Sequence, residues 1–165
     1  MGKYKTEVKW GVIFSIVMIL WMVFERIMGW HDQNIDQHMV MTNLFAIPAI
    51  TVYVFALLDK RKSDYKGKMT WKEGFISGLY ITLVVALLSP LAQVLIHTVI
   101  TPDYFQNVIE YAVSSGEQTR EAAEDYFNLQ SYMIQGLIGA IIMGVFTSAI
   151  VAAFTKKVDK NKVSE

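Results

Sequence analysis

Residues 132–154 read YMIQGLIGAIIMGVFTSAIVAAF, a run without a single Asp, Glu, Lys or Arg. A helix needs about 20 mainly apolar residues to cross roughly 30 Å of hydrocarbon, and this run has that length. A helix of a soluble bundle would instead carry a polar face along its whole length. The stretch therefore predicts a transmembrane helix and decides the fold class.

Three further apolar runs precede it, at residues 10–28, 39–58 and 74–100. Charged residues make up 18% of the chain, against about 25% in a soluble domain. The first run follows a basic start but no small-x-small cleavage site, so we interpret it as an uncleaved anchor. The sequence thus predicts an all-α integral membrane protein, with residues 1–165 forming a single membrane domain of four spans.

Basic residues indicate how these spans are oriented. Of the 15 Lys and Arg residues, all except Arg26 and Arg120 lie in the N-terminal segment, the connection after the second span, or the C-terminal tail. Basic residues next to membrane spans stay on the cytoplasmic side. We therefore expect both termini on the cytoplasmic side of the membrane.

The connection between the third and fourth spans is expected to be structured. Residues 102–128 alternate apolar and acidic positions at helical spacing, with Gly116 as a stop between two short helices. This pattern predicts an extracytoplasmic amphipathic helical hairpin that lies on the outer membrane surface or caps the bundle.

Small residues predict where the spans pack. Lipid gives no hydrophobic reward for helix association, so spans pair where small side chains let backbones approach. The candidate packing residues are Gly74, Gly78, Gly136, Ala140, Gly144, Ser148 and Ala152. They serve either as seams within one chain or as a homodimer face. Pro48 and Pro90 are expected to kink the second and third spans.

Polar residues gather in the outer halves of the spans. Such groups face protein or water when they lie at membrane depth. They predict a pocket for a small polar ligand or a lipid head group, unless they simply lie near head groups and water. The candidate pocket residues are Glu25, His38, Thr42, Asn43, Gln93, His97 and Gln135.

A cluster of candidate metal ligands occupies the loop after the first span. Imidazole and carboxylate groups suit zinc or a similar divalent ion. The residues of this type between positions 31 and 38 are His31, Asp32, Asp36 and His38. No recognised metal-site spacing matches them, and a polar outer loop is the alternative interpretation.

Other functional classes find no support. The chain has no Cys, which removes thiolate metal sites and Cys nucleophiles. No Gly-rich phosphate loop or nucleophile elbow is present, and the net charge of zero does not suggest nucleic acid. We expect neither enzymatic activity nor a cofactor.

Several short segments resemble a domain-of-unknown-function family of small four-span inner-membrane proteins, found mainly in Bacteroidetes-type bacteria. They are residues 42–50 (TNLFAIPAI), 57–62 (LLDKRK), 67–71 (GKMTW), 99–105 (VITPDYF) and 135–140 (QGLIGA). The resemblance covers nearly the whole chain and implies a bacterial inner membrane and a multi-span helical fold. It implies no established activity. Family genes often neighbour genes for polyprenyl-phosphate glycosyltransferases, which implies an accessory role in lipid-linked sugar handling.

Two functional hypotheses follow. The first is a non-enzymatic accessory subunit or small transporter-like oligomer, whose partners are membrane lipids and either another membrane protein or a second copy of the chain. The alternative is an outer-facing protein that binds or senses a metal through residues 31–38.

Overall fold

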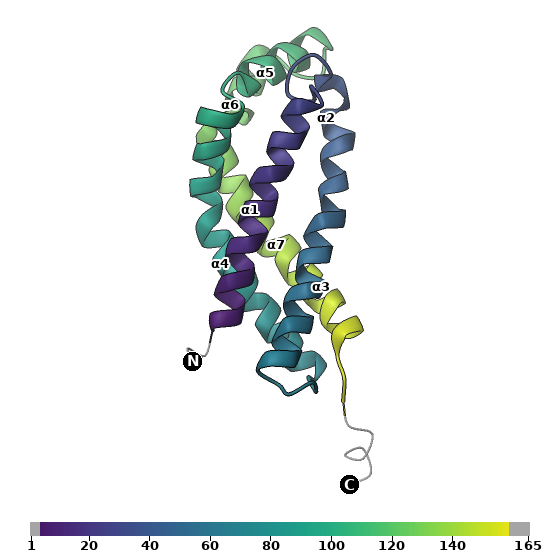
Figure 1. Cartoon of the computed structure of the whole chain (residues 1–165). Coiled ribbons are helices and arrows are strands. Elements are labelled where there is room, and N and C mark those ends of the chain that lie inside the picture. The colour runs from purple at the N-terminus through teal and green to yellow at the C-terminus, as the bar shows by residue number, and fades with distance from the viewer. Residues whose placement is uncertain (1–3, 159–165) are drawn as a thin grey trace.

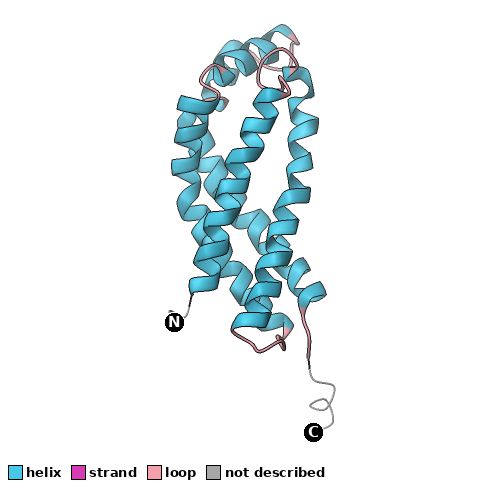
Figure 2. Cartoon of the chain, viewed as in Figure 1, coloured by secondary structure: helices cyan, strands magenta, loops and turns pink. Residues whose placement is uncertain are grey.

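The computed structural model describes residues 4–158 as a bundle of long helices capped at one end by two short ones (Figure 1). In chain order the elements are α1 (Lys5–Ile27), α2 (Ile35–Met41), the 3₁₀ segment η1 (Thr42–Phe45), α3 (Ala46–Ser63), α4 (Trp71–Leu95), the π-helical turn η2 (Ile96–Ile100), α5 (Tyr104–Ser114), α6 (Arg120–Tyr126) and α7 (Leu129–Thr155). Only short loops separate the helices within these residues (Figure 2).

Four stretches of helix are long and apolar enough to cross a membrane. They are α1, the continuous unit Ile35–Ser63, the unit Trp71–Ile100, and α7. Large apolar side chains cover their outer surfaces, with Phe154 84% and Leu91 70% exposed. Such a surface suits lipid and not water. The predicted all-helical class with four spans is confirmed, and the architecture is that of a multi-pass membrane protein.

Local sequence fixes where the helices begin. Thr70 and Glu73 form a capping box at the start of α4, in which each side chain bonds the backbone N–H of the other. Asn128 accepts the Ser131 N–H at 2.9 Å and caps α7. These caps satisfy N–H groups that have no partner within the helix.

Helices α4 and α7 cross closely where small residues meet. A Cβ atom on Gly78 would lie 2.5 Å from Ser148 Oγ, and one on Gly74 would lie 3.3 Å from Ala152 Cβ. Further along the same crossing, Gly144 faces Thr82, and Gly136 faces Ser89 and Gln93. Ala140 packs against the buried core. The candidate packing residues therefore lie between helices of one chain in this structure.

The two interior prolines have different consequences. Pro48 lies in the first turn of α3, directly after the 3₁₀ segment η1, where its missing N–H leaves few carbonyls without a partner. Pro90 lies within α4, and the π-helical turn η2 follows it by two turns. The helix irregularities of both spans, η1 and η2, therefore lie in the halves next to the α5–α6 hairpin.

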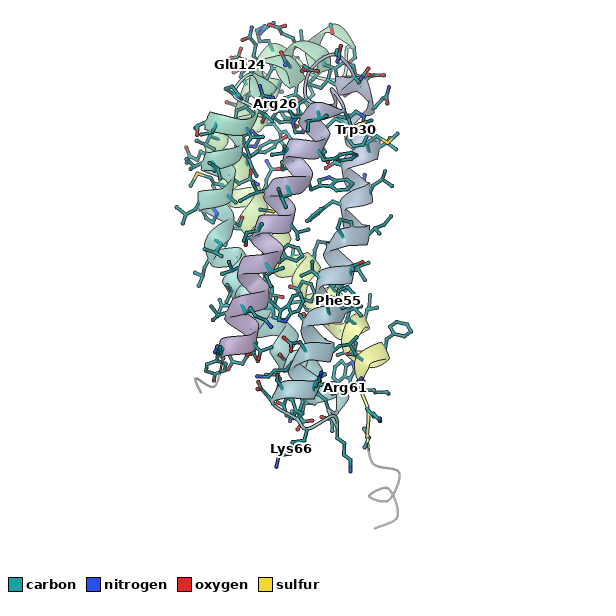
Figure 3. All side chains as sticks on the ribbon, in the orientation of Figure 1. Arg26, Trp30, Phe55, Arg61, Lys66 and Glu124 are labelled. Atoms are coloured by element: carbon teal, nitrogen blue, oxygen red, sulfur yellow. The ribbon has the colours of Figure 1, made fainter. Side chains whose placement is uncertain are left out.

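The two ends of the bundle differ in charge. Both described chain ends, and the loop after α3, lie opposite the α5–α6 hairpin (Figure 1). Arg61 and Lys66 lie at the loop end, and Arg26 and Glu124 lie at the hairpin end (Figure 3). At the loop end the buried Lys60 pairs with Glu7 at 2.7 Å and also with Asp64.

Candidate metal centre

Glu25 lies in the last two turns of α1 and is completely buried. One helical turn earlier, the Trp21 indole N–H donates to its Oε1. Side chains four residues apart lie on one face of a helix, so α1 aims both groups at the bundle interior. A buried carboxylate with one indole partner still needs partners for its second oxygen.

The chain turns back after α1 and brings His31 over this carboxylate. Gly29 has φ of 75°, a left-handed conformation that glycine adopts without strain. Asn34 closes the turn, because its backbone N–H donates to the Gly29 carbonyl at 2.8 Å and its side chain to the Met28 carbonyl at 3.0 Å. His31 is 3% exposed, and its Nε2 lies 2.9 Å from Glu25 Oε2.

The second imidazole comes from α2. His38 Nδ1 lies 3.6 Å from the same Glu25 oxygen, and the His31 and His38 rings meet at a centroid distance of 5.1 Å. One potential ligand atom from each of Glu25, His31 and His38 lies within 4.8 Å of the other two. We call these three residues the Glu–His–His cluster.

Protein hydrogen bonds do not satisfy this cluster fully. His31 Nδ1 and His38 Nδ1 are buried and have no hydrogen-bond partner. Buried polar atoms are normally hydrogen-bonded, so each exception needs an explanation. The donor set of two imidazoles and a carboxylate is one that holds zinc and leaves a fourth position open.

Helix α5 covers the cluster with an aromatic side chain. Tyr104 is 3% exposed, and its ring centroid lies 5.2 Å from His31, 5.3 Å from His38 and 5.3 Å from His97. All three histidines of the chain thus contact one tyrosine. The Tyr104 hydroxyl bonds to that of Tyr132 at 3.0 Å. Burial raises the pKa of Tyr104, so its hydroxyl stays protonated.

The sequence-predicted metal ligands separate into two groups. His31 and His38 meet at the cluster, whereas Asp32 and Asp36 are exposed. Asp32 Oδ1 accepts the Gln33 backbone N–H at 2.5 Å. The third carboxylate near the imidazoles is that of Glu25, which the sequence had assigned to the pocket.

The candidate pocket residues are also divided. Thr42 lies next to Glu25 and so joins it and His38 at the cluster. His97 stacks on Phe105 at a centroid distance of 4.3 Å and contacts Tyr104 at 5.3 Å. The remaining three lie apart: Gln93 is half-buried beside Gly136, and Asn43 and Gln135 are exposed.

Two residues of this site, Trp21 and Tyr104, are not among the site residues predicted from the sequence. Trp21 could have been found, because it precedes Glu25 by four residues on a predicted helix. Tyr104 gave no such signal, since its contacts with the histidines span the loop after α1, α2 and η2.

Comparison with known proteins gives a family but no characterised relative. The family model described as "protein of unknown function (DUF4199)" matches residues 9–157. The chain therefore belongs to this family. No curated protein matches it, and no solved structure does.

Proposed function

We propose that this member of the DUF4199 family binds one divalent transition-metal ion, with zinc preferred, through Glu25, His31 and His38. The observation that carries the proposal is that two buried side chains, Glu25 and His31, and the half-buried His38 offer ligand atoms within 4.8 Å of one another. The activity proposed is metal binding or sensing, without an enzymatic step.

An ion pair between Glu25 and His31 accounts for less of this geometry than a shared metal ion does. One carboxylate oxygen and one imidazole are explained by the 2.9 Å contact between Glu25 and His31. The second imidazole is not, because His38 Nδ1 lies 3.6 Å from the carboxylate and has no hydrogen-bond partner. A shared cation gives all three groups a partner at once.

Small movements suffice to form such a site. Zinc binds nitrogen and oxygen at about 2.0–2.2 Å, so ligand atoms in a tetrahedral site lie roughly 3.3–3.5 Å apart. Separations of up to 4.8 Å then need to close by about 1.5 Å at most. Rotation about the side-chain torsions of His31 and His38 provides that range, and the fourth position is left for water.

The site is proposed to face the outside of a bacterial inner membrane. Tyr104 of the hairpin helix α5 covers it, while the loop carrying Arg61 and Lys66 lies at the opposite end of the bundle (Figure 3). Basic loops remain on the cytoplasmic side. The metal would therefore come from the extracytoplasmic solution and not from the cytoplasm.

Metal analysis of the purified protein tests this proposal. Protein in a neutral detergent is stripped with a chelator, loaded with zinc, desalted and analysed for bound metal. The wild type should retain about one zinc per chain. Glu25→Gln and His31→Gln should each weaken binding by at least tenfold, since each removes one of three ligands.

Asp36→Asn is the matched control. Asp36 is exposed and lies between the two histidines in sequence, so its loss should leave the stoichiometry unchanged. Circular dichroism and size-exclusion profiles verify that each variant is folded. No stoichiometric zinc on the folded wild type, or an equal loss in Asp36→Asn and His31→Gln, would refute the Glu–His–His assignment.

A second candidate function is a non-enzymatic accessory subunit or small transporter-like oligomer, with a role in lipid-linked sugar handling. The observation that favours it is at Gly139, where an added Cβ would meet no atom within 4 Å. The same helix packs Gly136 and Gly144 tightly against α4, so Gly139 lies on a face that the described chain leaves open. Co-purification from native membranes in mild detergent tests this: a stoichiometric partner or a dimer supports it, and a monomer alone refutes it.

A further inference from the structure

Two connected depressions lead from the hairpin surface to His31. The wider one holds about 410 Å³ between the α1–α2 turn and α5, and its walls include Asp32, Asn107 and Glu110. The narrower one holds about 60 Å³, which is enough to admit water. Asp32 and Asn107 line both, and His31 lines only the narrower.

The charges along this path favour cations. Asp32 and Glu110 lie in the wider depression, and Asp32 and Asp103 in the narrower. Arg26 is the one basic residue among the lining groups of the two depressions, and its guanidinium donates to the Ile100 carbonyl. Three carboxylates against one guanidinium give a negative potential, which raises the local concentration of a divalent cation.

We propose that these depressions form the entrance by which a hydrated divalent cation reaches the Glu–His–His cluster. This inference rests on the proposed metal-binding function and adds the route to the site. The cation loses water in the narrow part, where His31 is the first ligand it meets. His31 suits this role because it is nine-tenths buried, carries an unpartnered Nδ1 and also contacts Glu25 through Nε2.

Asn107 holds the entrance in shape. Its side-chain amide donates to the His31 carbonyl at 2.9 Å, which fixes α5 to the turn that carries the histidine. Tyr104, one turn earlier on α5, packs against the His31 ring. Helix α5 thus supplies one wall of the path and the cover of the site.

Association kinetics test the entrance separately from the site. Cobalt(II) serves as the probe, because its visible absorption changes when it enters a site of nitrogen and oxygen ligands. Stopped-flow mixing at low ionic strength gives the association rate constant. Asp32→Asn and Glu110→Gln should each slow association roughly threefold, since the lost charge attracts a divalent ion across several ångströms.

Arg26→Gln should instead accelerate association by a similar factor, because it removes the opposing charge. All three substitutions retain a hydrogen-bonding amide and are not proposed ligands, so the amount of cobalt bound at saturation should be unchanged. Half-molar salt should abolish most of the differences. Glu121→Gln, an exposed acid on α6 outside both depressions, is the control and should behave as wild type.

The outcomes separate the two proposals. Failure of the folded wild type to bind cobalt would refute the metal site and the entrance together. Normal saturation with unchanged rates in the Asp32, Glu110 and Arg26 variants would refute the entrance alone. Opposite rate changes for the acidic and basic variants, lost in high salt, would establish it.

Discussion

Gly78→Ala should destabilise the bundle although it adds only one methyl group. The new Cβ would lie 2.5 Å from Ser148 Oγ, 2.6 Å from Ser148 Cβ and 3.2 Å from Ser148 Cα. Ser148 is completely buried and its hydroxyl donates to the Gly144 carbonyl at 2.6 Å. The partner atoms therefore belong to a fixed side chain and a backbone, so helices α4 and α7 have to separate.

The magnitude follows from two opposing effects. Overpacking a well-packed contact costs about 1–3 kcal/mol, while alanine gains up to about 1 kcal/mol over glycine within a helix. Gly139→Ala has only the gain, because nothing lies within 4 Å of its added Cβ. The two variants should therefore differ by about 2 kcal/mol, or roughly 4–8 °C in Tm for a chain of this size.

The assay is thermal unfolding in a neutral detergent, followed by circular dichroism or by the loss of the monodisperse chromatographic peak. The decisive variant combines Gly78→Ala with Ser148→Gly, which adds a methyl group on one helix and removes the facing hydroxymethyl group from the other. A double-mutant cycle should show that Ser148→Gly recovers most of the Gly78→Ala loss. Ser148→Ala should recover little, because it keeps the Cβ that clashes.

Two results would refute the reasoning. One is an equal Tm for Gly78→Ala and Gly139→Ala, which would mean that the crossing is not close at Gly78. The other is additivity of Gly78→Ala and Ser148→Gly, which would mean that the two positions do not touch.

Three further predictions concern topology, the ion pair and pH. A cysteine at Glu117 should react with a membrane-impermeant thiol reagent in intact cells and one at Lys62 should not; the reverse pattern would overturn the proposed orientation. Lys60→Met should lower the free energy of unfolding by about 3–5 kcal/mol, because the Glu7 carboxylate stays buried without its cation. Adding Glu7→Gln should restore part of this loss, whereas full stability of Lys60→Met alone would contradict a buried ion pair. Since the pKa of Tyr104 is raised above its usual 10, the unfolded chain releases this proton at a lower pH than the folded chain, so stability should fall above pH 10. Tyr104→Phe should reduce this fall in urea unfolding measured at pH 9–11, and an unchanged pH dependence would refute the raised pKa.

The spans and the hairpin were predictable because each is encoded locally. The length of a continuous apolar run such as residues 132–154 is enough to indicate a membrane span. Gly116 likewise marks the break between two short amphipathic helices. The close contact between α4 and α7 was predictable for the same reason, since Gly78 and Gly144 belong to series of small residues spaced four positions apart.

The candidate metal site could be predicted only in part from the sequence, because the position of its residues depends on a turn of the backbone. The sequence grouped His31 with Asp32, which is adjacent, whereas the turn at Gly29 reverses the chain and places His31 on Glu25 instead. Neighbours in sequence point to different sides of such a turn. The position of Tyr104 depends on how α5 docks on the bundle, and no local pattern records that docking.

The location of the three candidate ligands early in the chain has a consequence for biosynthesis. Glu25, His31 and His38 all lie between positions 25 and 38, while the Tyr104 cover is synthesised much later. At about 5–20 residues per second, several seconds of translation separate His38 from Tyr104. With the proposed orientation and metal site, the nascent first hairpin would present all three ligands to the extracytoplasmic side before Tyr104 is in place, so metal loading would accompany insertion and not wait for the finished bundle.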